Sequence, residues 1–321
     1  MKVDIETFIY VTSPIVHYLI LRENPEWLNP QNMDRLADRI ASARADDDPT
    51  RVQAIGEKQC LLKTCAETGI PRAVLGISSD FFTESSLGPI ATVTQYGETI
   101  IAAAMADPPL PAADLARRLA PFTTDTGAPP SLVTAEAHLR LCALALNHPG
   151  EALAASVPTD PAYHLTCAQT GFTRDTAPFM WAKGQQYQAA ISRMNRLNPY
   201  RYDAAIQHLC AALAVYDTTP APVAQAVCRL NLGIYLFENP RGDRAANRET
   251  AVLQGERALE GFPADTLPVY RALTHMNLGT IIRNRTSGSR SENLAAAIDH
   301  YLHALTVFTR SFHPVNWAMI H

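Results

Sequence analysis

The chain has 321 residues, of which 47% are hydrophobic, 18% charged and only 7% aromatic, and it contains 15 glycines. This length suffices for two domains or for one elongated repeat array. The formal charge is −4, from 27 basic and 31 acidic side chains. A balance of this sign provides no electrostatic footprint for nucleic acid or for an anionic membrane, so neither is expected as a partner.

The N-terminus and the cysteines predict a cytoplasmic protein. Asp4 and Glu6 stand where a signal peptide carries positive charge. The apolar run 15–21 is interrupted by His17 and is too short to cross a bilayer. No paired spacing joins the six cysteines, which are Cys60, Cys65, Cys142, Cys167, Cys210 and Cys228. In a chain of this length they predict buried, reduced thiols rather than a disulfide framework or a zinc site.

Residues 1–75 form the first of three regions and are expected to be helical. Apolar side chains at positions 33, 36, 40 and 43 follow the spacing of one helix face. A second helix is expected over 52–65, and it ends near Gly69.

Residues 76–175 form a divergent region that we also expect to be helical. The segments 90–94 and 99–101 have the composition of strands, but the alanine-rich sequence around them favours one helix.

Two more helices are expected in this region, over 112–119 and 131–146, between proline-rich loops. The second of them could pair with 151–156 as a divergent repeat. The stretch 158–176 is interpreted as the joint to the following array.

A 46-residue repeat organises residues 176–321. Asn231-Leu232-Gly233 recurs as Asn277-Leu278-Gly279. The same offset relates Gly242 to Gly288, Arg244 to Arg290, Asn247 to Asn293, Ala251 to Ala297, Ala258 to Ala304, Phe262 to Phe308 and Pro268 to Pro314. So many matches at one period indicate a repeated structural unit. The last copy is incomplete at His321.

Each repeat unit is expected to contain two helices. The first helix covers 222–238 and again 268–284, with proline in its first turn. Glycine in a helix interior is less favourable than alanine by about 1 kcal/mol, so its return at 233 and 279 predicts a closely packed neighbouring helix. The second helix carries alanines seven residues apart on its packing face.

These features resemble the tetratricopeptide repeat (TPR), with a period of 46 instead of 34. The segments 242–247 and 314–318 are similar to the long-loop repeats of bacterial proteins that also carry a CHAT-type, caspase-like domain. The segment 24–70 is similar to a helical pair found in those proteins. The resemblance implies an all-α, right-handed superhelical solenoid, regular after about residue 176, with a less regular N-terminal region.

The first unit of the array is degenerate. Trp181, Gly184 and Tyr187 mark its first helix, but Gly184 precedes Ala205 by 21 residues. The corresponding separation is 18 residues in the next two units.

The resemblance also implies a binding groove lined by the first helix of each unit. In such repeats an asparagine before the Leu-Gly pair often bonds the backbone of a bound peptide, and Asn231 and Asn277 stand at this position. A primary amide both donates and accepts, so it can pair with an extended chain of any sequence. The other expected partner-binding residues are Leu230, Ile234, Phe237, Met276, Thr280, Arg283 and Asn284. The alternative is that the two asparagines bond neighbouring helices.

The function expected from these features is that of a protein–protein interaction scaffold or adaptor that binds a peptide or a partner protein in the groove. By the resemblance, it would regulate an effector such as a CHAT-type protease. The uncovered face of the incomplete last unit would suit self-association or the rest of a longer protein. Two alternatives stay open: an enzyme with a helical pocket built from residues such as Glu136, His138 and His164, or a small-molecule-responsive regulator.

No catalytic residue, metal ligand or cofactor site is assigned from the sequence, so an enzyme is not favoured. Phosphate loops, nucleophile elbows, dinucleotide fingerprints and zinc-protease motifs do not occur. Asp299, His300 and His303 share one helix, as do His138 and Cys142. Neither set has the further ligands that a metal site requires.

Overall fold

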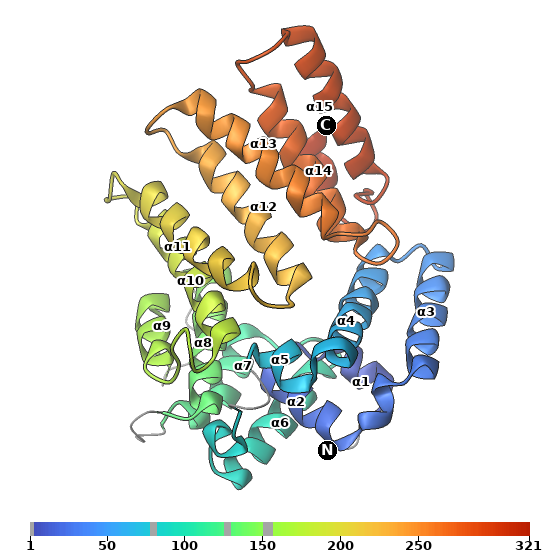
Figure 1. Cartoon of the computed structure of the whole chain (residues 1–321), viewed down its shortest axis with the longest axis vertical. Helices are drawn as coiled ribbons and strands as arrows, with labels where there is room; N and C mark the ends of the chain where they lie inside the picture. Colours follow the sequence, from blue (N-terminus) through green and yellow to red (C-terminus); the bar gives the residue numbers. More distant parts are fainter. Residues whose placement is uncertain (1–2, 78–81, 125–129, 150–156) are drawn as a thin grey trace.

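The computed structural model describes residues 3–77, 82–124, 130–149 and 157–321 (Figure 1). These residues contain sixteen α-helices and three short 3-10 helices, and most helices pack against the next one along the chain. The expectation of an all-α chain of paired helices is thereby confirmed. Among the described residues, no helix combines the length and the apolar character needed to cross a bilayer.

Local capping defines many of the N-terminal helices. The elements are α1 (Ile5–Tyr10), α2 (Pro14–Glu23), η1 (Pro25–Leu28), α3 (Pro30–Ala45), α4 (Pro49–Thr68), α5 (Ile70–Leu75), η2 (Glu84–Leu87), α6 (Ile90–Ala104), α7 (Ala112–Leu119), η3 (Ala120–Thr123), α8 (Leu132–Asn147) and α9 (Pro161–Gln169). Helices α2, α3, α4 and α9 each begin with proline, after a Ser, Asn or Asp whose side chain accepts a hydrogen bond from the first turn. Such a cap satisfies a backbone donor that has no partner within the helix.

The helices expected over 33–43, 52–65, 112–119 and 131–146 are confirmed as α3, α4, α7 and α8, and one helix, α6, covers 90–104. The stretch 158–176, interpreted as the joint to the array, contains a helix that was not expected. This helix is α9, which Asp160 caps and which packs against α8. The segment 151–156, considered as the partner of α8, lies outside the described residues.

The repeat array consists of three helical pairs and one final helix. They are α10 (Pro178–Met194) with α11 (Arg201–Tyr216), α12 (Pro222–Glu238) with α13 (Arg244–Glu260), α14 (Pro268–Arg283) with α15 (Arg290–Leu305), and α16 (Pro314–Ile320). The boundaries expected for α12 and α14 agree to within one residue. The alanines seven apart, such as Ala251 and Ala258, are fully buried.

Close packing explains the two repeated glycines. A Cβ atom at Gly233 would lie 3.1 Å from the carbonyl oxygen of Ala251 on α13. One at Gly279 would lie 2.7 Å from the ring of Tyr301 on α15. Both distances are too short for an ordinary contact, so the expected close approach of the partner helix is confirmed. At Gly184 in the degenerate unit the nearest atom is 3.5 Å away, which is ordinary van der Waals contact.

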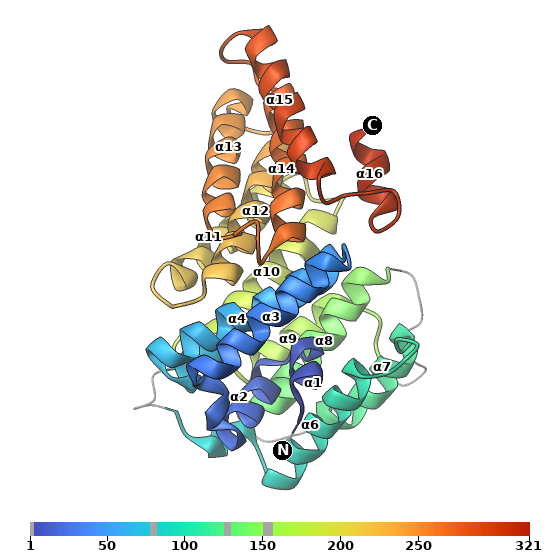
Figure 2. The same cartoon turned by 90° about the vertical axis from the view of Figure 1, so that its right-hand side faces the viewer.

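The N-terminal half folds back against the array, with α4 reaching the start of α14 (Figures 1 and 2). The backbone of Thr266, in the loop before α14, passes directly over Gly56. The Tyr270 N–H donates to Gln53 Oε1 at 3.4 Å. Cys60 joins the apolar cluster formed by α12, α13 and the start of α14. The chain therefore covers part of its own repeat array.

Candidate functional site

A set of partly buried or exposed side chains lies at helical spacing on α10, α12 and α14; its members on α10 and at the start of α12 line a cavity together with α4 and α8. We call it the inner stripe. It consists of Phe179, Lys183 and Tyr187 on α10, Val223, Val227 and Asn231 on α12, and Leu273, Asn277 and Thr280 on α14. Positions three or four apart share one face of a helix, which accounts for the spacing within each set. The inner stripe contains three of the residues expected to bind a partner.

The two asparagines of the inner stripe differ in their hydrogen bonding. Asn277 Nδ2 donates to the carbonyl of Leu273, one turn earlier in the same helix, at 2.8 Å. The half-buried amide of Asn231 makes no hydrogen bond to any residue that the structure describes. Because a half-buried amide gains from pairing, Asn231 is the residue of the pair that is free to bind a ligand.

The remaining expected partner-binding residues divide into packed and open ones. Leu230 and Met276 are only 4% and 8% exposed and lie in apolar cores between helices, which leaves them little surface for a partner. Ile234 and Phe237 are partly buried against the same kind of core. Arg283 is exposed at the end of α14.

The hydroxyl of Thr280 and the amide of Asn284, at the end of α14, both form hydrogen bonds with nearby residues. Thr280 Oγ1 is 3.1 Å from both the Met276 carbonyl and the Tyr301 hydroxyl. Asn284 Nδ2 donates to the Thr280 carbonyl at 2.8 Å and leaves its amide oxygen exposed to solvent. Asn284, directly after α14, therefore presents one acceptor next to the end of the inner stripe.

A cavity of about 590 Å³ lies between the N-terminal half and the first part of the inner stripe, and we call it the junction cavity. Side chains of α4 and α8 line one side, and side chains of α10 and α12 line the other. The lining is mainly apolar and includes Leu61, Val74, Leu139, Leu144, Met180, Val223 and Val227. The charged residues in the lining are Glu57, Lys58, Glu136, Arg140 and Lys183.

Lys58 is a buried lysine on the wall of the junction cavity, with 4% of its surface exposed. Its Nζ donates to the carbonyl of Val11 at 2.6 Å. His17 Nε2 lies 2.9 Å from the same oxygen. Burial lowers the pKa of Lys58 to about 8, because the charged form loses hydration. Burial also lowers the pKa of His17 well below its usual value, so this histidine is neutral at pH 7.

Glu136 and Arg140 form an ion pair one turn apart on α8, with Arg140 Nε 3.0 Å from Glu136 Oε1. The other carboxylate oxygen of Glu136 accepts from the backbone N–H of Ile15 at 3.3 Å. The pair is therefore neutral as a unit, and its carboxylate helps to hold the start of α2.

His138 and His164, which an enzyme pocket could have used together with Glu136, line neither of the two cavities described here. Their Nδ1 atoms are 3.1 Å apart. Burial, and then the charge of His164, lower the pKa of His138 to about 4. The structure therefore does not bring the three residues together around a pocket.

Each histidine of α14 and α15 lies next to another polar side chain. His300 Nδ1 is 2.9 Å from Nδ1 of His275, and His303 Nε2 is 3.5 Å from Asp299 Oδ2. Within the described residues, no group of three or more histidine, cysteine or acidic side chains is arranged to hold a metal ion.

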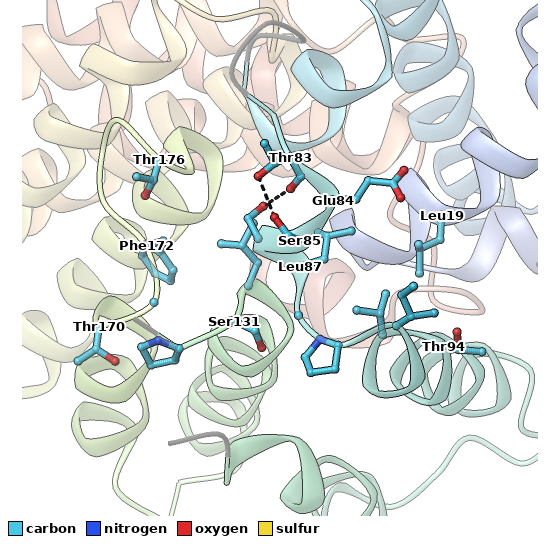
Figure 3. Close-up of a pocket in the computed structure, with 18 of the residues that line it drawn as sticks. Leu19, Thr83, Glu84, Ser85, Leu87, Thr94, Ser131, Thr170, Phe172 and Thr176 are labelled. Atoms are coloured by element: carbon cyan, nitrogen blue, oxygen red, sulfur yellow. Dashed lines mark hydrogen bonds between the residues drawn. The ribbon is translucent and has the colours of Figure 1, made fainter. Parts of the chain in front are cut away.

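A second, larger cavity of about 960 Å³ lies among α2, η2, α6 and the segment after α9 (Figure 3). The hydroxyl groups in its lining form hydrogen bonds within nearby turns. Ser85 donates to Thr83 at 3.3 Å, and Thr173 and Thr176 bond each other at 3.1 Å. Glu84 accepts from the Tyr18 hydroxyl at 2.8 Å. Because these polar groups already have partners, this cavity is the weaker candidate site.

The cysteines supply no reactive site. All six are free, and Cys65, Cys142 and Cys228 are buried as expected. The expectation is wrong for Cys210, which is exposed on α11, and Cys60 and Cys167 are partly exposed. Burial raises the pKa of Cys65, Cys142 and Cys228 to about 12 in each case, so these thiols stay protonated.

The chain matches no protein-family model, no curated protein and no solved structure in the three comparisons made. The resemblance to tetratricopeptide repeats therefore rests on the motifs and period of this chain itself.

Lys58 and Lys183 are not among the site residues expected from the sequence. Lys58 stands between Ile55 and Leu62 in the apolar stripe of α4, at positions that share one helix face. A charged residue within an apolar stripe is the signal that could have identified it. Lys183 occupies the position of Leu232 and Leu278 in the later units, and a lysine at a leucine position of the repeat is the corresponding signal.

Proposed function

We propose that the chain is a protein–protein interaction module that binds an extended peptide segment of a partner along the inner stripe. The observation that carries this proposal is the half-buried amide of Asn231, which has no partner among the described residues. An amide in this state can accept from and donate to the backbone of an extended chain. The acceptor of Asn284 and the exposed Arg283 extend the same polar track on α14.

The position of α4 limits where such a peptide can lie. It packs against Thr266 and Tyr270 at the start of α14, so this end of the inner stripe is covered by the chain itself. The binding stretch in this proposal is the opposite end, from Asn231 on α12 to Asn284 on α14. An effector such as a CHAT-type protease is the partner class that the sequence resemblance favours, and the fold alone selects no partner.

The test uses a random-peptide library displayed on phage and selected on the full chain. We expect selected peptides to lose about tenfold or more in affinity for Asn231→Ala, because one amide supplies two hydrogen bonds. Leu253→Ala, at an exposed position on α13, is the matched control and should bind as the wild type does. Failure to enrich any peptide, or equal loss in both variants, would contradict the proposal.

We also propose self-association through the last unit. Ile298 and Leu302 on α15 and Val315 and Met319 on α16 are between 58% and 70% exposed. Each helix carries its two exposed apolar side chains one turn apart, and exposed apolar side chains of this kind suit a protein contact. Light scattering across a concentration series should show wild-type dimers and monomeric Leu302→Glu. A wild-type chain that stays monomeric would remove this part of the proposal.

A further inference from the structure

The junction cavity has the size and position of a ligand site. Pockets for small organic molecules generally measure about 300–1,000 Å³ and often lie between domains. The junction cavity measures about 590 Å³ and is bounded by the N-terminal half on one side and by the array on the other. Its mainly apolar lining would hold the body of such a molecule.

The charges in the lining are not balanced. The carboxylate of Glu136 is paired with Arg140 at 3.0 Å. Glu57 Oε1 accepts from the amide of Gln53 at 3.0 Å, which does not neutralise it, so two acidic side chains in the lining stand against three basic ones. Lys58 and Lys183 form no ion pair with any carboxylate of the described residues.

Of these two cations, Lys58 has the greater need of a negatively charged partner. It is almost fully buried, and its ammonium group has three donors, of which the Val11 carbonyl occupies one. A buried ammonium is unfavourable unless it is paired, and the charge of Glu57 offsets only part of this cost because it forms no ion pair with Lys58. Lys183 is exposed and lies over the ring of Tyr187, 5.2 Å from its centre. An anion in the cavity would supply the missing negative charge.

The surrounding groups favour a carboxylate over a phosphate. Phosphate sites generally use unpaired arginines or the free N–H groups of a helix N-terminus. In the junction cavity the arginine is already paired, and Pro222 at the first position of α12 removes one N–H group of the first turn. A single negative charge on an apolar body matches one buried lysine in an apolar lining.

We propose that the junction cavity binds a small organic monocarboxylate with an apolar body, and that Lys58 holds its carboxylate. Lys183, on the opposite wall, contributes a second, solvent-screened attraction. Because α4 and α10 both line the cavity, the ligand contacts the N-terminal half and the array together. This site is independent of the peptide-binding stretch proposed above, and Asn231 does not line it.

The test measures binding of three eight-carbon probes to the full chain by titration calorimetry at pH 7. The probes are octanoate, 1-octanol and octyl phosphate, which share the apolar chain and differ in the head group. We expect octanoate to bind about tenfold or more tightly than 1-octanol, because an ionic hydrogen bond to a buried group is worth at least this factor. Octyl phosphate should bind more weakly than octanoate.

Substitutions of the lining residues test whether the probes bind in the junction cavity. Lys58→Met should remove the preference for octanoate over 1-octanol while it leaves the binding of 1-octanol unchanged. Lys183→Met, at an exposed position, should weaken octanoate by a smaller factor. Ala143→Phe, on the cavity wall, should abolish the binding of all three probes by filling space. Leu253→Ala, at an exposed position on α13 outside the cavity, is the control and should bind as the wild type does.

Circular dichroism checks that each variant folds. If Lys58→Met does not fold, the proposal is tested by Lys183→Met and Ala143→Phe, and both variants must bind octanoate more weakly than the wild type. The proposal is overturned if octanoate and 1-octanol bind equally, if folded Lys58→Met keeps the preference, or if no probe binds at millimolar concentration. Tighter binding of octyl phosphate than octanoate would overturn the assignment to a carboxylate.

Discussion

The regular repeat units and the N-terminal half are both helical, but different contacts hold them together. In α12–α15, small residues recur at fixed spacing, and the fully buried Ala251 and Ala258 let paired helices approach closely. In the N-terminal half, polar groups such as Lys58 and the pair of Glu136 and Arg140 lie between the helices. The comparison shows that a sequence period records contacts within a unit, whereas the contact between the two halves depends on single residues.

The largest effect should come from breaking that single-residue contact with Gly56→Ala. A Cβ atom at position 56 would overlap the backbone oxygen of Thr266 and lie 2.7 Å from its carbonyl carbon. Because the obstacle is backbone, it can be relieved only if α4 moves away from the array. Overpacking of this kind costs about 1–3 kcal/mol, and we expect the upper end or beyond. Urea unfolding with circular dichroism measures the loss. A variant as stable as the wild type would show that the two halves do not touch at this point.

The second effect concerns the buried charge of Lys58 and its pH dependence. Burial lowers the pKa of Lys58 from 10.5 to about 8, so the unfolded chain binds more protons between these values. Stability therefore rises with pH across this window relative to Lys58→Met, which carries no charge. A shift of this size corresponds to about 3 kcal/mol.

We accordingly expect Lys58→Met to exceed the wild type in stability at pH 7 and to lose this advantage near pH 10.5. Both proteins contain the same buried thiols and tyrosines, so the difference in their urea unfolding free energies isolates the lysine. A difference that does not change with pH would show that the ammonium group is hydrated in the folded state.

A third, smaller effect distinguishes the regular units from the degenerate one. Gly279→Ala would place Cβ 2.7 Å from the Tyr301 ring, which can shift by moving away from α14. We expect a loss of about 1–2 kcal/mol in the free energy of unfolding, since the gain in helix propensity offsets part of the overlap. Thermal unfolding measured by circular dichroism gives this value. A gain in stability would indicate that the close contact is absent.

The matched change in the degenerate unit, Gly184→Ala, should have the opposite sign. Its Cβ would meet Phe172 and Leu165 at 3.5 and 3.6 Å, which are ordinary contact distances. The helix propensity of alanine should then stabilise the chain by up to about 1 kcal/mol. The same thermal measurement applies, and a loss similar to that of Gly279→Ala would mean that all units pack alike.

The sequence predicted the array well because one contact type recurs in it. The prolines at 222 and 268 and the Asn-Leu-Gly motif located α12 and α14 to within one residue. In the N-terminal half, apolar spacing located α3 and α4 but missed α9, whose cap at Asp160 precedes a short helix with two apolar core residues. Short helices of this kind leave too little periodic signal.

The site was less predictable, because it depends on how the two halves meet. Asn231 and Asn277 were identified from one motif, yet only the structure shows that Asn277 is bound to its own helix. Leu230 and Met276 have the spacing of groove residues but lie in the cores between helices. The junction cavity is built from elements more than 100 residues apart, and no local pattern reports such a contact.

Helix α4 covers part of the array, and the reactivity of Cys60 on α4 tests this directly. This thiol is partly exposed and packs against the array, whereas Cys210 is exposed and Cys65 is buried within the N-terminal half. The measurement is the rate of alkylation of each cysteine by a bulky polyethylene-glycol maleimide, read by mass spectrometry after digestion. We predict slow labelling of Cys60 in the wild type and fast labelling in Gly56→Ala, with Cys65 protected in both. Labelling of Cys60 as fast as that of Cys210 in the wild type would contradict the claim.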